Sequence, residues 1–70
     1  MAEVLAPLAG KILAILVEPG AKVEEDDELV VIEALKMENT VYAPSAGTVK
    51  EINIKVGDSV EDETLLIVLE

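Results

Sequence analysis

The side chains that could carry out chemistry in this 70-residue chain are fifteen carboxylates and five lysines, and the chain has no histidine or cysteine. Without these two residue types it lacks the common zinc ligands, thiol nucleophiles and the histidine of a catalytic triad. We therefore expect a carrier or binding module that is not itself an enzyme and that holds no metal. The absence of cysteine also excludes disulfides and is compatible with the cytoplasm, where we expect the protein to be located.

One lysine has unusual neighbours. Lys36 lies between Leu35 and Met37, with Glu33 and Glu38 just outside them, and strand-like residues flank the whole segment. We expect a β-hairpin whose tip is at or near Lys36. Hairpin tips normally use Gly, Asn or Asp, so two large apolar side chains there indicate a surface that a partner recognises. The alternatives are that Leu35 packs back into the core and that the two glutamates are ordinary solvated flanks.

An internal repeat organises the chain. Residues 6–33 align without gaps with residues 43–70, and the segment 34–42 is left unmatched between them. The clearest matches are Ala6-Pro7 with Ala43-Pro44, Gly10 with Gly47, Gly20 with Gly57, and Val23-Glu24 with Val60-Glu61. We therefore expect one domain over residues 1–70, with halves 6–33 and 43–70 joined by an attachment hairpin at 34–42.

Each half is typical of short strands separated by turns. Residues 18–21 read Glu-Pro-Gly-Ala, which favours a type II turn, and we expect all four glycines to provide turn geometry. Apolar residues at 52, 54 and 56 predict a half-buried strand, and Val49 is out of phase with them, which predicts a bulge near Lys50-Glu51.

The segment 24–39 contains strong helix formers, but its apolar residues would surround a helix instead of forming a stripe, so we predict strands there. Neither half could close a core alone. We expect an all-β fold of two small sheets packed face to face with approximate two-fold symmetry.

The formal net charge of −10 argues against nucleic acid and anionic lipid surfaces, which both favour basic patches. No apolar stretch approaches the length of a membrane span, so we expect no direct membrane insertion, and no signal peptide is recognisable. The acidic surface instead suits protein partners with basic surfaces.

The segment Glu33-Ala34-Leu35-Lys36-Met37-Glu38 resembles the Glu-Ala-Met-Lys-Met attachment motif of biotinyl domains, the biotin carboxyl carrier domains of the biotin/lipoyl attachment family. Residues 42–49, Tyr-Ala-Pro-Ser-Ala-Gly-Thr-Val, resemble that family's Ala-Pro-x-x-Gly-x-Val element. The resemblance covers essentially the whole chain. It implies a barrel-sandwich hybrid, a flattened barrel of two four-stranded antiparallel sheets, with Lys36 at a hairpin tip and the termini near the opposite end.

The resemblance also implies a function. Biotin would be attached covalently to Lys36 by a biotin protein ligase, with Ala34, Leu35, Met37, Glu33 and Glu38 as recognition residues. The biotin arm would then shuttle carboxyl groups between partner active sites of a biotin-dependent carboxylase, decarboxylase or transcarboxylase. The implied partners are biotin carboxylase and carboxyltransferase subunits.

This chain departs from the biotinyl motif at Leu35, where the family usually has Met. Lipoyl domains share the fold, but their motif typically reads Asp-Lys-Ala, so the neighbours of Lys36 favour biotin. Two alternatives stay open: a lipoyl carrier domain of a 2-oxoacid dehydrogenase complex, and a non-carrier interaction module in which Lys36 is unmodified.

Overall fold

Eight strands and no helix make up the computed structural model, which describes residues 1–70. The strands are β1 (Ala2–Leu5), β2 (Gly10–Ile15), β3 (Lys22–Val23), β4 (Glu28–Ala34), β5 (Met37–Tyr42), β6 (Gly47–Ile52), β7 (Ser59–Val60) and β8 (Leu65–Leu69). They form two four-stranded antiparallel sheets, which we call the tip sheet (β5-β4-β2-β7) and the second sheet (β1-β8-β6-β3). The prediction of an all-β fold with two such sheets is confirmed.

The two sheets have the same topology: three strands of each come from the repeats, and β1 and β5, which lie outside the repeats, take equivalent edge positions. The positions of β5, β4, β2 and β7 in the tip sheet are those of β1, β8, β6 and β3 in the second sheet. Each half contributes strands to both sheets, and paired hydrogen bonds cross between the halves: Gly20 N donates to Val49 O, and Gly57 N donates to Ile12 O, each at 2.8 Å. The halves therefore interlock, and the pseudo-two-fold symmetry predicted from the repeat is present.

The core lies between the two sheets and contains only apolar side chains. Fifteen buried residues form one cluster, and no polar or charged residue is buried. Its completely buried members include Ile12, Leu29 and Ile32 from the tip sheet and Leu66 and Ile67 from the second sheet. Burying one such side chain contributes about 1.5–3 kcal/mol to folding. The segment 24–39, which we predicted to form strands although it contains strong helix formers, supplies β4. This strand has more core residues than any other strand of the tip sheet.

The turn predictions are confirmed at equivalent positions. Ala21 N donates to Glu18 O at 3.0 Å with Gly20 at φ 90°, and Asp58 N donates to Lys55 O at 3.1 Å with Gly57 at φ 96°. These are type II turns, in which the third residue needs positive φ. Gly10 and Gly47 have no positive φ, so the expectation that they provide turn geometry is wrong for those two glycines.

One strand prediction was partly right. The bulge near Lys50-Glu51 is confirmed, because the β6·β8 register shifts between Val49 and Glu51. The alternation from 52 to 56, however, does not mark one strand. β6 ends at Ile52, and Val56 lies in the next turn, 63% exposed, because Gly57 closes the turn there.

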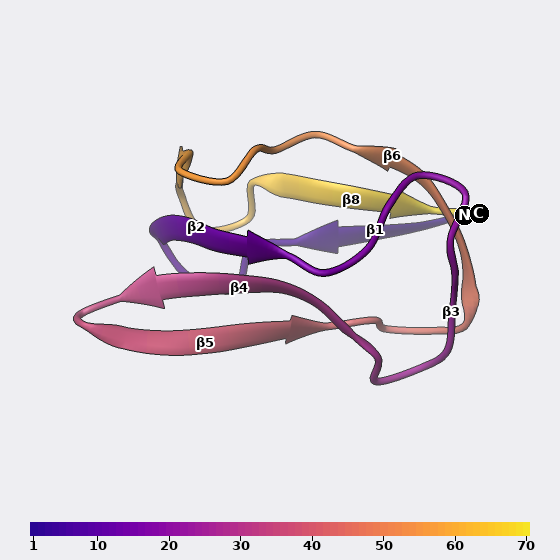
Figure 1. Ribbon diagram of the computed structural model, residues 1–70, viewed down its shortest axis with the longest axis horizontal. Helices are drawn as coiled ribbons and strands as arrows, with labels where there is room; N and C mark the ends of the chain where they lie inside the picture. Colours follow the sequence, from indigo (N-terminus) through magenta and orange to yellow (C-terminus); the bar gives the residue numbers. More distant parts are fainter.

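The termini and the β4–β5 turn lie at opposite ends of the molecule (Figure 1), which measures 30 × 19 × 18 Å. The chain contains no helix that is long and apolar enough to cross a membrane.

Candidate functional site

The β4–β5 hairpin ends in a turn of two residues. Its ladder continues to the pair Ala34 and Met37, which leaves only Leu35 and Lys36 to reverse the chain. Both have positive φ, 53° and 64°, as the two central residues of a type I′ turn require. Asn and Gly adopt this geometry easily, whereas a residue with a larger side chain is strained by about 1–2 kcal/mol. The chain therefore keeps two strained residues at this turn, which we call the tip.

The tip presents its side chains to solvent. Lys36 is exposed, Leu35 is 95% exposed and Met37 is 66% exposed, while Ala34 is half-buried at the base of the turn. Leu35 does not pack into the core, so the alternative that it folds back is wrong. The β4–β5 turn lies at the end of the molecule opposite the termini (Figure 1), and it carries one exposed amine between two exposed apolar side chains.

Charged residues lie immediately behind the tip. Glu33 on β4 and Glu38 on β5 are directly opposite each other, and Lys11 on β2 is opposite Glu33. All three are exposed. Like charges that face each other across a ladder are destabilising, and the neighbouring lysine offsets part of this repulsion. The structure thus brings together the six residues predicted to form the site, Glu33 to Glu38. It also places Lys11 beside them, which the sequence did not indicate.

Close packing of β2 against β4 holds the base of the hairpin. A Cβ atom placed on Gly10 would lie 2.6 Å from Ile32 Cγ2, with the backbone of Glu33 also in contact. Ile32 is completely buried two residues before Ala34, which anchors β4 in the core. From the sequence we predicted that Gly10 forms a turn, whereas in the structure it allows β2 to approach β4 closely. The sequence feature that could have indicated this role is the recurrence of glycine at the equivalent position, Gly47.

The other lysines lie in different settings. Like Lys36, they are all exposed, so exposure does not separate them. Lys11, Lys22 and Lys50 lie within strands, and Lys55 is the first residue of a type II turn. Lys36 is the one lysine in a two-residue hairpin turn.

Two equivalent turns lie at the acidic runs 24–28 and 61–63, and each turn is closed by a side-chain hydrogen bond. Asp27 Oδ2 accepts a hydrogen bond from Glu24 N at 2.8 Å, and at the equivalent place Thr64 Oγ1 accepts one from Glu61 N at 3.1 Å. The hydrogen bonds close two tight turns. No three acidic side chains gather into a metal-binding group.

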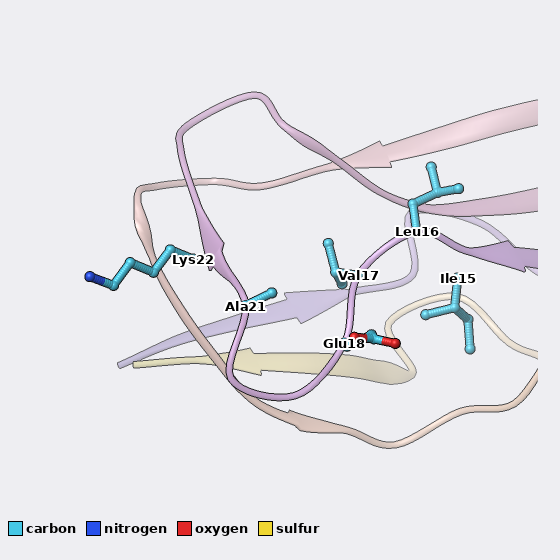
Figure 2. Close-up of a pocket in the computed structure, with 6 residues that line it drawn as sticks. All are labelled: Ile15, Leu16, Val17, Glu18, Ala21 and Lys22. Carbon is cyan, nitrogen blue, oxygen red and sulfur yellow. The ribbon is translucent and has the colours of Figure 1, made fainter.

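A shallow open pocket lies away from the tip. It is lined by Ile15, Leu16, Val17, Glu18, Ala21 and Lys22, on the connection from β2 to β3 (Figure 2). This connection leads to the end of the molecule that carries the termini (Figure 1). No tip residue lines the pocket, so it is not part of the candidate site.

Comparison with known proteins gives one consistent family. The sequence model of the biotin/lipoyl family, described as "Biotin-requiring enzyme", matches residues 2–69. Over 38 residues the chain is 53% identical to the gamma subunit of glutaconyl-CoA decarboxylase from Acidaminococcus fermentans, a match that covers 54% of this chain and 26% of that one. Over 39 residues it is 49% identical to the alpha subunit of mitochondrial methylcrotonoyl-CoA carboxylase from Oryza sativa subsp. japonica, covering 56% and 5%.

Solved structures agree with the sequence matches. The urea carboxylase of Kluyveromyces lactis superimposes with a TM-score of 0.93 at 32% identity, covering 99% of this chain and 6% of that one. A single-chain, multi-domain long-chain acyl-CoA carboxylase gives 0.89 at 29% identity, covering 94% and 6%. In each comparison the match spans about a quarter or less of the larger protein.

Proposed function

The chain belongs to the biotin/lipoyl family of biotin-requiring enzymes, and from this membership we propose that it is a biotin carboxyl carrier with biotin linked covalently to Lys36. The observation that carries the proposal is the position of Lys36 in an exposed two-residue turn between two exposed apolar side chains. The chain would carry the cofactor without being an enzyme itself, and we propose that it works in the cytoplasm.

The tip fits this cofactor. Attachment requires an amine that a ligase can reach, and Lys36 is exposed at the end of a protruding hairpin (Figure 1). Attached biotin supplies a ureido nitrogen that accepts and releases a carboxyl group, chemistry that belongs to the cofactor. The deprotonated amine of Lys36 would attack biotin that the ligase has activated as an acyl adenylate. The amide bond would form as the carbonyl–phosphate bond breaks and AMP leaves. The positive charge of the lysine would be lost, which changes the formal net charge from −10 to −11.

The remaining tip residues would act by contact and position. Leu35 and Met37 offer apolar surface on both sides of the amine, and Glu33 and Glu38 place negative charge behind it. The type I′ turn fixes the backbone at Lys36, and with it the direction in which the side chain leaves the hairpin. A tether raises the effective concentration of the cofactor at each active site that the arm can reach.

The relatives support partners of the carboxylase type, and covalent attachment of biotin calls for a ligase. We propose a biotin protein ligase, together with biotin carboxylase or carboxyltransferase subunits of a biotin-dependent carboxylase, decarboxylase or transcarboxylase. Glutaconyl-CoA decarboxylase and methylcrotonoyl-CoA carboxylase, whose subunits resemble this chain, are enzymes of these types by name. The relatives, together with the Leu and Met that flank Lys36, favour biotin over lipoate.

The test is the intact mass of the chain after co-expression with a biotin protein ligase and supplied biotin, followed by peptide mapping. We expect a single biotinyl increment on Lys36 and none on the Lys36→Arg variant, because a guanidinium is not acylated under these conditions. An unmodified chain, or biotin that remains on the Lys36→Arg variant, would contradict the proposal. Modification by a lipoate ligase alone would favour the lipoyl carrier instead.

A further inference from the structure

The outer faces of the two sheets differ in charge although the sheets have the same topology. On the tip sheet, Ala14, Val31 and Thr40 are neighbours across β2, β4 and β5. At the equivalent place on the second sheet, Val68 lies between Glu3 and Glu51. A row of uncharged side chains on one sheet thus corresponds to a valine between two acids on the other.

The side chains of these rows face away from the core. Strand residues alternate between the two faces of a sheet, and Val30, Ile32 and Val41, the neighbours of Val31 and Thr40, belong to the core cluster. Val68 is buried but does not belong to that cluster, which fits a position on the outer face beneath its acidic neighbours. Its counterpart Val31 is only half-buried.

Two larger apolar residues extend the uncharged row. Tyr42 is 52% exposed and Leu16 is 49% exposed, and both lie next to inward-facing residues of the tip sheet. Tyr42 is the only aromatic residue of the chain. Their counterparts by the pseudo-two-fold symmetry of the sheets are Leu5 and the polar Asn53. We call the set Ala14, Leu16, Val31, Thr40 and Tyr42 the uncharged face.

Acidic residues flank this face at both ends along β4 and β5, and Lys11 on β2 is the one basic residue beside them. Glu33 and Glu38 lie on the side toward the tip, and Glu28, paired with Tyr42, lies at the other end. An apolar centre with a charged rim is the usual anatomy of a protein–protein interface, and exposed tyrosine is enriched at the residues that contribute most to binding. The rim calls for a partner whose own rim is basic.

We infer that the uncharged face is a docking surface for the biotin protein ligase, whose contacting surface would be apolar at the centre and basic at the rim. The ligase must bring its active site to the lysine amine itself, within the length of one side chain from the tip. Its surface must therefore lie against the hairpin. Thr40 is four residues beyond Lys36, about 14 Å along the strand, so the uncharged face begins within reach of an enzyme held at the tip.

This inference rests on the proposed function, and its test separates the two. The test measures initial rates of biotinylation of the apo chain by purified biotin protein ligase as the concentration of the chain is varied. The variant Ala14→Glu with Thr40→Glu gives the tip sheet the acidic pair of the second sheet. We expect KM for the chain to rise about tenfold while kcat stays within twofold, because binding is lost and the reacting atoms are untouched.

Two controls match this variant residue for residue. Glu3→Thr with Glu51→Ala removes the acids from the second sheet, and we expect its KM to be unchanged. Combining all four substitutions exchanges the two faces and keeps the formal net charge at −10, and we expect the raised KM again. A wild-type KM in the exchanged variant would mean that net charge caused the effect, and it would overturn the inference.

Folding is checked by the melting temperature of each variant. If the acidic pair lowers the melting temperature, a second variant decides the question through the same rise in KM. This variant is Leu16→Asn with Tyr42→Leu, which places the residues of the symmetry-related positions on the tip sheet. Unchanged KM in both variants overturns the inference and leaves the proposed function intact, whereas failure of the wild-type chain to accept biotin overturns both. Sedimentation velocity gives the remaining outcome: dimers that the acidic pair abolishes would identify the face as a self-association surface and overturn the ligase assignment.

Discussion

Leu35 and Lys36 share one type I′ turn and both have positive φ, although neither is a residue type that favours this conformation. Elsewhere in the chain positive φ occurs at Gly20 and Gly57, and at Asp26 and Glu63, which are equivalent positions in the two repeats. Those four residues follow the symmetry of the fold. The tip does not, because it lies in the segment that the repeat leaves unmatched, and its strain is therefore a local feature of the β4–β5 hairpin.

The strain at the tip should be measurable by substitution. We expect Leu35→Asn to stabilise the fold by about 1 kcal/mol, since Asn tolerates left-handed backbone geometry and the 95% exposed leucine loses no packing. For a domain of this size the melting temperature should rise by about 4–8 °C. Leu35→Met is the control and should leave it unchanged, because Met is strained to a similar degree. A lower melting temperature for Leu35→Asn would show that Leu35 stabilises the fold.

The fold was largely predictable because the repeat and the turn residues act locally. Ala6-Pro7 and Ala43-Pro44, with the glycines at 20 and 57, divide the chain into strands, and the interlocking of the halves follows because neither half has enough apolar residues for its own core. The unusual neighbours of Lys36 were visible in the sequence, and so was a hairpin there.

Other features depend on register between distant strands, which one sequence does not encode locally. The row of Lys11, Glu33 and Glu38 appears only once β2, β4 and β5 are aligned. The alternation that continues to Val56 misled for a related reason. Apolar periodicity persists past Ile52, although β6 ends there and Val56 lies in the turn that Gly57 closes.

Gly10 should tolerate substitution poorly although its backbone has no positive φ, because it packs closely against β4. We expect Gly10→Ala to destabilise the fold by about 1–3 kcal/mol, because the added Cβ would press on Ile32 and on the backbone of Glu33. Gly20→Ala is the comparison: a Cβ there meets nothing within 4 Å, and its cost of about 1 kcal/mol comes from positive φ alone. Chemical denaturation checks both. Equal or reversed costs would mean that β2 and β4 separate easily.

Asp27 should stabilise its turn by one hydrogen bond. Its Oδ2 accepts from Glu24 N at 2.8 Å, so Asp27→Ala should cost about 0.5–1.5 kcal/mol, and Asp27→Asn, which keeps an acceptor oxygen, should cost less. Thr64→Val tests the equivalent turn, where Oγ1 accepts from Glu61 N. Urea denaturation measures the difference. If the alanine and asparagine variants were equally stable, the side-chain hydrogen bond would contribute nothing.

The last prediction concerns the two glutamates that face each other behind the tip. Because Glu33 and Glu38 are directly opposite on β4 and β5, Glu38→Lys turns a repulsive pair into an attractive one, and we expect it to stabilise the fold by about 0.5 kcal/mol at low salt. Glu38→Gln removes the repulsion without adding attraction and should give a smaller gain. Both gains should shrink as salt is added, since the side chains are exposed and their interaction is screened. The measurement is the free energy of unfolding by urea at two salt concentrations. Stabilisation that does not depend on salt would show that β-propensity, and not charge, distinguishes the variants. A loss of stability would mean that Glu38 makes a favourable interaction in the native hairpin, and that this interaction outweighs its repulsion from Glu33.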